Sequence, residues 1–230
     1  MDLLDFGLSP LRDHFPPDVY TEALRRARRI RVNDGHSFLS RGERLVGLCI
    51  VVEGAVRIGR IRPDGSFNLI AMLGPGLHFG DVALHRTVSS QHVEAMGRTQ
   101  IDVIDPSTFE TLLDDQPGFA VGLLRANNAR FDALLEIYDD ARTLTVAVRL
   151  AKVIHLHAGR GALKDGVSCR QRDLAQLLGV TEVSIGNALK ELETFELVKI
   201  GYRCVQVPDK TRLGAWLRNL GAAGNLRPSP

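Results

Sequence analysis

The sequence predicts an α+β fold with three consecutive parts: an N-terminal β domain (a sandwich, a jelly roll or a small barrel), one long helix, and a compact C-terminal unit of short helices with a β-hairpin. Three observations support this prediction. Short apolar runs separated by turn-forming residues fill residues 31–105, no proline interrupts residues 118–207, and two amphipathic helical segments flank Gly179. We expect the parts to span residues 1–115, 116–145 and 146–221, followed by a tail over residues 222–230.

Composition places the chain among ordinary globular proteins. Its 230 residues are 44% hydrophobic and 24% charged, which suits one or two domains with their own cores and excludes wholesale disorder. The longest apolar stretch, residues 45–52, is too short to cross a membrane, and residues 1–7 lack the basic start of a secretory signal. Cys49, Cys169 and Cys204 match neither a zinc-binding pattern nor a disulfide framework. We therefore expect a soluble, cytoplasmic protein without a membrane contact or a metal site.

Residues 9–30 are expected to form a short helical opening. Pro17 suits the first turn of a helix, and a basic run over residues 25–29 lies near its end. We interpret this run as a charged helix end that faces water rather than as an anion-binding patch.

Residues 31–105 have the pattern of an antiparallel β-fold. Strand-like runs such as residues 48–52, 55–61 and 101–104 alternate with turn signals, which is typical of a sandwich, a jelly roll or a small barrel. Residues 63–66, Pro-Asp-Gly-Ser, indicate a hairpin turn, because proline presets one backbone angle and glycine accepts the positive one.

Two helices are expected to follow the β region. Asp105 suits the N-cap of a short helix that begins at Pro106 and runs to Leu113. Pro117 begins a long helix whose large residues recur at heptad-like spacing, a pattern typical of helix pairing. We predict that this seam joins two copies of the chain rather than packing inside one. It comprises Leu124, Asn128, Phe131, Leu135 and Tyr138.

Residues 171–190 show the pattern of a helix-turn-helix. Small Ala175 permits a close helix crossing, Gly179 suits a left-handed turn between the helices, and Thr181 suits the N-cap of the second helix. The β-like runs on either side of Gly201 add a hairpin behind these helices. Together they predict a winged helix-turn-helix, preceded by one further helix over residues 146–160.

The C-terminal part also has the charge expected of a nucleic-acid-binding unit. Residues 146–230 contain 13 Lys and Arg against 7 Asp and Glu, whereas the rest of the chain contains 16 against 20. Solvent-facing residues at the start of the second helix are candidates for base contacts, and nearby basic and hydroxyl groups are candidates for phosphate contacts. The predicted DNA-binding residues are Arg170, Arg172, Thr181, Glu182, Val183, Ser184, Asn187, Lys190 and Arg203, with Lys199 beside them on the wing.

With this order of parts, the chain resembles the Crp/Fnr superfamily of bacterial transcription regulators from about residue 15 to 207. Beside the helix-turn-helix, the resemblance rests on residues 41–43 (Arg-Gly-Glu), 51–56 (Val-Val-Glu-Gly-Ala-Val), 75–76 (Pro-Gly) and 79–81 (Phe-Gly-Asp). It implies a cyclic-nucleotide-binding jelly roll, a dimerisation helix, and a homodimer on a palindromic double-stranded DNA site with recognition helices about 34 Å apart. We also expect RNA polymerase as a partner.

The recognition helix departs from the pattern of many superfamily members. They carry Glu at the position of Val183 and Arg at that of Asn187. We therefore expect the preferred DNA sequence to differ from the familiar operators, while Thr181 and Ser184 keep groups suited to phosphate contact.

The effector pocket implied by the resemblance also departs from the pattern. In cyclic-AMP-binding members, a glutamate after Phe-Gly holds the ribose hydroxyl and a later Arg-Ser pair holds the cyclic phosphate. Here Asp81 and Ser89 stand at the glutamate and arginine positions, so a guanidinium is missing unless Arg86 replaces it. We expect that cyclic AMP is not bound in the usual way. The expected pocket residues are Phe79, Gly80, Asp81, Val82, Ser89, Ser90, Leu134 and Leu135.

The sequence gives little support for the other cofactors of the superfamily, and we assign no cofactor. An iron–sulfur cluster is excluded, because it needs several N-terminal cysteines and residues 1–48 contain none. A haem alternative rests on His78, His85 and His92 with Met96 nearby, but we expect these histidines in loop or surface roles.

Two other classes of function stay open beside the leading one. The first is a nucleotide- or haem-binding sensor that acts mainly on another protein. The second is an enzyme on a cupin-like barrel. Such an enzyme would need a cluster of histidines and a carboxylate that faces inward and binds a metal, and His78 and His85 with Asp81 match this requirement poorly. The leading interpretation is a dimeric, sequence-specific transcription regulator without catalytic residues, whose two winged helices reorient about a hinge at residues 144–146.

Overall fold

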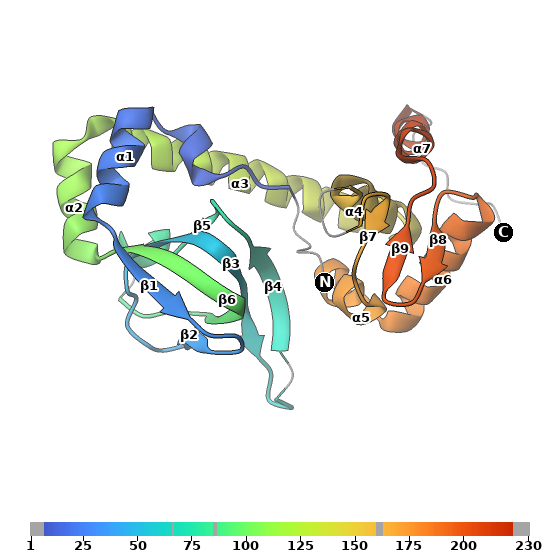
Figure 1. The fold of residues 1–230 in the computed structure, drawn as a ribbon, viewed down its shortest axis with the longest axis horizontal. Helices are drawn as coiled ribbons and strands as arrows, with labels where there is room; N and C mark the ends of the chain where they lie inside the picture. Colours follow the sequence, from blue (N-terminus) through green and yellow to red (C-terminus); the bar gives the residue numbers. More distant parts are fainter. Residues whose placement is uncertain (1–6, 66, 85–86, 160–162, 223–230) are drawn as a thin grey trace. The chain divides into compact units, whose positions relative to one another are not determined.

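The computed structural model describes residues 7–65, 67–84, 87–159 and 163–222, and its chain divides into two compact units (Figure 1). One unit is Leu8–Asp132, and the other begins at Ala133 and includes Gly7. The long helix α3 (Pro117–Thr143) contributes residues to both. The predicted α+β fold, with its β domain, long helix and helix-turn-helix, is confirmed.

The first unit is built on an antiparallel β-sheet. Its strands are β1 (Arg28–Val32), β2 (Ser37–Leu39), β3 (Leu48–Ile61), β4 (Phe67–Leu73), β5 (His78–Phe79) and β6 (His92–Ile104). They lie in the order β1-β6-β3-β4, with β2 paired to β6 and β5 paired to β3 (Figure 1). The long strands β3 and β6 shift register twice, so the sheet can curve around its own core.

The apolar residues of this unit form two cores, one on each side of the sheet. Inside the curved sheet lie alternating residues such as Val51, Val56 and Ile101. The second core joins the outer side to η1 (Leu11–His14), α1 (Pro17–Arg26), α2 (Pro106–Asp115) and the start of α3. At its centre the Phe119 ring lies 5.4 Å from Phe15 and 5.6 Å from Phe109, which fixes α3 against the β-roll.

The helices after the sheet begin where the sequence places them. The Asp105 carboxylate accepts hydrogen bonds from the backbone N–H groups of Ser107 and Thr108, both at 3.1 Å, as expected of an N-cap. The Ser107 and Thr108 hydroxyls donate further hydrogen bonds to this carboxylate at 2.6 and 2.7 Å, and these, with the backbone ones, lower the pKa of Asp105 to about 2. The capped helix α2 ends at Asp115, slightly beyond the predicted Leu113, and α3 begins at Pro117 as predicted.

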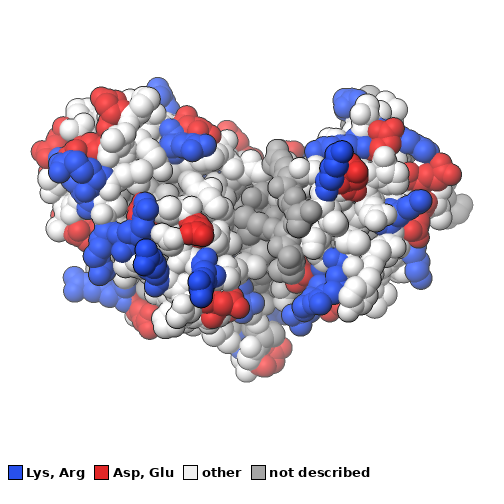
Figure 2. Space-filling view, in the orientation of Figure 1, with Lys and Arg blue, Asp and Glu red and all other residues white. Residues whose placement is uncertain are grey.

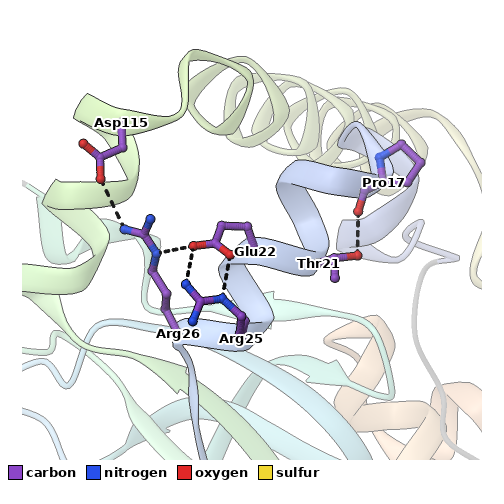
Figure 3. Close-up of polar contacts among 6 residues, drawn as sticks. All are labelled: Pro17, Thr21, Glu22, Arg25, Arg26 and Asp115. Atoms are coloured by element: carbon purple, nitrogen blue, oxygen red, sulfur yellow. Dashed lines mark hydrogen bonds and ion pairs between the residues drawn. The ribbon is translucent and has the colours of Figure 1, made fainter.

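On the face shown in Figure 2, lysine and arginine side chains are spread over both units and interleave with acidic and uncharged ones. The basic run over residues 25–29, which begins in the last turn of α1, is largely ion-paired. The Glu22 carboxylate accepts hydrogen bonds from Arg25 at 2.7 and 2.8 Å and from Arg26 at 2.7 Å, and Arg26 also reaches Asp115 at 3.4 Å (Figure 3). Because these ion pairs neutralise much of the positive charge, little of it remains to bind an anion. This supports the interpretation of the run as a charged helix end that faces water.

One part of the predicted helical opening is wrong, because residues 28–30 belong to strand β1. Ile30 and Val32 face the inner core, whereas Arg29 points outward and binds the buried Asp102 carboxylate of β6 through two hydrogen bonds of 2.8 Å. This alternation has a period of two residues, which fits a strand and not a helix.

The second unit is mostly helical. It contains α4 (Val146–His157), α5 (Gln171–Leu178), α6 (Glu182–Thr194) and α7 (Lys210–Ala222), with a small sheet of β7 (Gly166–Val167), β9 (Cys204–Gln206) and β8 (Lys199–Gly201) in that order. Helix α4 packs against α5, α6 and α7, and its Leu150, Ala151 and Ile154 are fully buried. The predicted helix over residues 146–160 therefore ends three residues early, at His157.

The sequence analysis missed two elements of this unit, β7 and α7. Helix α7 had a usable signal: the backbone N–H of Arg212 donates to the Asp209 carboxylate at 2.9 Å, and Leu213 and Leu217 follow at helical spacing. Strand β7 has two residues and no such signal. The predicted tail lies outside the described residues except for Ala222, which ends α7. In the part of the chain that the structure describes, no helix is long and apolar enough to cross a bilayer.

Candidate nucleic-acid interface

The turn between α5 and α6 is defined by local contacts. Gly179 has a φ of +65°, a left-handed conformation that favours glycine, and the Val180 N–H donates to the Ala175 carbonyl at 3.0 Å. The Thr181 hydroxyl accepts a hydrogen bond from the Ser184 backbone N–H at 3.1 Å and so caps α6. The structure therefore contains the small residue, the left-handed glycine and the cap that the sequence indicates.

Helix α6 has one buried face and one exposed face. Ile185, Leu189 and Leu192 are buried against the rest of the unit. On the opposite side Val183 is 73% exposed, and Asn187 is also exposed. A helix with one face fixed in a core and short polar or apolar side chains on the other has the form that fits a DNA major groove.

The remaining predicted contact residues lie close to this exposed face along the sequence, and they too are accessible to solvent. Arg170 and Arg172 lie at the start of α5, and the exposed Lys190 follows along α6. Thr181 and Glu182 are exposed, and Ser184 is half-buried. Among the described residues, the ion pairs of this unit use other cations, so no carboxylate neutralises Arg170, Arg172 or Lys190.

The wing carries a residue that the sequence analysis missed. Between β8 and β9, Tyr202 is 91% exposed, and the Arg203 guanidinium lies 6.0 Å from the centre of its ring. Arg203 itself has a φ of +54°, so the hairpin turn projects both side chains outward. The sequence contained a signal for Tyr202, because it is an aromatic residue next to Gly201 at the tip of the predicted hairpin. The Ile200 N–H donates to the Glu193 carboxylate of α6 at 3.0 Å, which ties the wing to that helix.

The candidate effector site lies in the β-roll, after β5. Phe79 is buried, and Gly80 has a φ of +82° with no room for a side chain, since a Cβ would lie 2.1 Å from the Gly47 carbonyl oxygen. Asp81 begins η2 (Asp81–Leu84) and lies 3.6 Å from the guanidinium of Arg130 on α3. Arg130 also donates to the His78 carbonyl at 2.8 Å. Arg130 was not predicted, because nothing in the sequence pairs it with a loop fifty residues away.

The other predicted pocket residues are placed less favourably for a phosphate. The buried Ser89 hydroxyl donates to the Gln91 carbonyl at 2.8 Å and accepts from the Gln91 N–H at 3.2 Å, so its bonding capacity is used within its own loop. Ser90 is half-buried and Val82 is exposed. Leu134 and Leu135 are exposed and belong to the other unit. Arg86 lies outside the described residues.

The histidines do not form a metal site in the described ranges of the chain, where no three His, Cys, Asp or Glu side chains come together. His78 contacts Arg130, and the His92 ring accepts the Arg41 N–H at 3.4 Å. His85 lies outside the described residues.

His78 makes the β-roll sensitive to mild acid. Burial, with help from the Arg130 charge, lowers the pKa of His78 to about 3. The unfolded chain then binds a proton below pH 6.5 that the folded chain does not bind, so the free energy of unfolding is expected to fall by about 2 kcal/mol as the pH drops from 6.5 to 5. Urea unfolding at several pH values measures this loss, and it should disappear in His78→Gln. The variant is needed because burial also lowers the pKa of His155 in the other unit; an unchanged acid response in His78→Gln would contradict the assignment.

The predicted dimer seam is an exposed row along α3. Leu124, Phe131, Leu135 and Tyr138 are each 50–61% exposed, and Asn128 is exposed between them. The opposite side of the helix's first half is buried in the β-roll core. Large apolar side chains in a row on a helix normally mark a surface that pairs with another one.

The fold and these surfaces define the class of the protein: a DNA-binding transcription regulator that joins a nucleotide-binding type of β-roll to a winged helix-turn-helix. Residues 29–116 match the family model of the cyclic nucleotide-binding domain, and residues 148–216 match that of the Crp-like helix-turn-helix domain. The chain belongs to the Crp/Fnr family of transcription regulators.

Named relatives agree with this assignment. The chain is 26% identical over 189 residues to the CRP-like cAMP-activated global transcriptional regulator of Mycobacterium tuberculosis, covering 78% of this chain and 83% of that protein. It is 27% identical to the cyclic AMP receptor protein of Thermus thermophilus, covering 89% and 95%. Among solved structures, FixK2 from Bradyrhizobium japonicum has the same fold, with a TM-score of 0.68 at 21% identity over 82% of this chain and 96% of that chain.

Proposed function

We propose that the protein acts as a homodimer that binds a palindromic double-stranded DNA site in a sequence-specific manner and so regulates transcription. The observation that carries the proposal is the exposed face of α6, where Val183 and Asn187 face solvent while Ile185 and Leu189 fix the helix in the core. In the dimer, two such helices enter successive major grooves. The relatives are regulators rather than enzymes, and we assign no catalytic residue.

Contacts fall into two groups under this proposal. Glu182, Val183 and Asn187 read base edges, since Asn suits adenine, a carboxylate can accept from cytosine, and valine can touch a thymine methyl. Arg170, Arg172, Lys190 and Arg203, with the Thr181 and Ser184 hydroxyls, contact phosphates and position the helix. Tyr202 at the wing tip joins the second group, because its hydroxyl and ring are fully accessible. Under this proposal the protein also contacts RNA polymerase. We place it in the cytoplasm, because transcription takes place in that compartment.

We further propose that the β-roll does not bind cyclic AMP in the manner of the cyclic-AMP-binding members. Asp81 is engaged by Arg130, and the Ser89 hydroxyl is used within its loop. The guanidinium that the described residues place at this site, Arg130, already contacts Asp81 and the His78 carbonyl. Calorimetric titration with cyclic AMP and cyclic GMP, together with a visible spectrum for haem, tests this; tight nucleotide binding would overturn it.

The phosphate contacts predict a specific salt response. Affinity for DNA should fall as salt rises, and Arg172→Ala should flatten the plot of log K against log salt by about 1 per half-site, because one released counterion per half-site is lost. Sequence preference should not change. Fluorescence titrations at several salt concentrations measure the slope.

The control is Arg12→Ala, which removes the same charge from an exposed residue of the other unit. It should leave the slope unchanged. Affinity that does not depend on salt would contradict the DNA interface altogether and would favour the alternative of a sensor that acts on another protein.

A further inference from the structure

The second unit contains a cavity of about 670 Å³ that the proposed function does not use. Its walls come from the end of α3, from α4, from the end of α5 and from α7. Most of the lining is apolar, with half-buried side chains such as Ile137, Leu156 and Leu217. Small-molecule sites are typically mostly apolar cavities of about 300–1,000 Å³ with a few polar groups, and this cavity has that size and composition.

Helix α4 contributes two polar atoms to the lining residues that have no partner in the described part of the chain. Arg149 Nε and His155 Nδ1 are buried there without a hydrogen bond. Buried polar groups in folded proteins nearly always have a partner, so each exception calls for an explanation such as a bound molecule. Two such atoms on residues of one cavity therefore indicate a ligand with a polar end.

Positive charge gathers where α4 meets α7. The His155 ring and the Arg218 guanidinium both come within 3.4 Å of the point where a Cβ of Gly214 would lie. That Cβ would be only 2.9 Å from His155 Cε1, so a glycine inside the helix, where alanine is the better helix former, keeps the space that the two side chains share. Burial, with the charges of Lys210 and Arg218, lowers the pKa of His155, which is the response expected in a positive environment.

The acidic residues of the lining do not neutralise this charge. All three lie on α3, where Glu136 and Asp140 bind Lys152 and the third is exposed. Among the described residues, neither Arg149 nor Arg218 has a carboxylate partner. The cavity therefore combines an apolar interior with unpaired cations, which complements a molecule that has an apolar body and a negative end.

We propose that this cavity binds a small organic carboxylate with an apolar body. The body lies among the leucine and isoleucine side chains, and the carboxylate pairs with Arg218 beside His155, while Arg149 adds positive charge to the same cavity. The lining also includes Leu144, in the proposed hinge, and Leu178, next to the turn of the helix-turn-helix. A bound carboxylate would contact both, so it would bias the orientation of the recognition helix; this effect on DNA binding rests on the proposed function, whereas binding of the carboxylate does not.

The test titrates the full chain with hexanoate, decanoate and tetradecanoate, each below its micelle-forming concentration. Trp216 is the single tryptophan of the chain and lies on α7 beside the lining residues Leu217 and Arg218, so its fluorescence reports on that wall. We expect saturable binding of these acids. Decanol and decyltrimethylammonium should bind at least tenfold more weakly than decanoate, because neither supplies a negative charge. With decanoate bound, hydrogen exchange should slow in α4 and α7 and stay unchanged in β3 and β6.

Three variants locate the site. Arg218→Gln should weaken decanoate binding about 10- to 100-fold, the usual effect of losing a hydrogen bond between charged groups, and should leave decanol binding unchanged. The matched control is Arg212→Gln, which removes the same charge from the same helix at a residue that pairs with Glu196 instead, and it should bind decanoate as the unchanged protein does. Ala141→Phe, at an exposed position of the lining on α3, should weaken decanoate and decanol alike, because its ring takes up part of the cavity.

Four results would each overturn the proposal. They are no saturable binding of any of the three acids, equal affinity for decanol and decanoate, equal effects of Arg218→Gln and Arg212→Gln, and slower exchange in β3 and β6 alone. None of these measurements involves DNA, so their failure would leave the proposed function untouched. A protein that binds decanoate at Arg218 but binds no DNA would contradict the proposed function and not this site.

Discussion

Replacing Phe131 and Leu135 together by aspartate is expected to convert the protein to monomers and to abolish binding to DNA that contains two half-sites. Both side chains lie on the exposed row of α3, at 59% and 50% exposure, so the single chain should fold without them. In a dimer each would be buried, and burying unpaired carboxylates in an apolar seam costs several kcal/mol. Analytical ultracentrifugation measures the assembly, and titration with palindromic and half-site duplexes measures the binding.

The matched control for the seam is Arg125→Asp, which introduces the same residue at an exposed position of the same helix outside the row. It should remain a dimer and bind DNA as the unchanged protein does. Circular dichroism should show equal helix content in all three proteins. A dimer that persists in the Phe131→Asp, Leu135→Asp variant would place the interface elsewhere.

Replacing Asn187 by alanine is expected to weaken specific DNA binding roughly 30- to 20,000-fold and to relax the preference at one base pair in each half-site. A good base contact of this kind contributes about 1–3 kcal/mol, and the dimer makes it twice. Binding to unrelated DNA should hardly change, because phosphate contacts supply it. Selection of bound sequences from random DNA, followed by titration of the selected site, measures both effects.

The control for Asn187 is Thr211→Ala, at an exposed position of α7 that the proposed interface does not use. Its affinity and preferred sequence should match those of the unchanged protein. If Asn187→Ala weakened binding to all sequences equally, Asn187 would contact the backbone rather than a base.

The parts that sequence analysis predicted well depend on neighbours along the chain. The cap at Thr181, the left-handed Gly179 and the cap at Asp105 each involve residues within a few positions, so residue type and spacing are sufficient to predict them. The error at residues 28–30 has the opposite cause. Their strand character comes from Ile101 and Asp102 of β6, more than seventy residues away, which pair with an arginine-rich segment that has no strong pattern of its own.

The candidate effector site shows the same limit. Asp81 is recognisable from the sequence around it, but its partner Arg130 comes from a helix that folds back onto the β-roll. The burial of Phe119, Leu123 and Ala126 in the outer core sets the position of that helix. Contacts between distant segments therefore had to come from the structure.

The hydrogen bond between the Ile200 amide and Glu193 has a consequence for how a signal could reach DNA. It holds the wing to the recognition helix, so the two should travel as a single rigid body. In the proposed dimer, a regulatory signal would then change the contacts of the helix and of the wing together, and we expect it to act by changing the distance and angle between the two recognition helices.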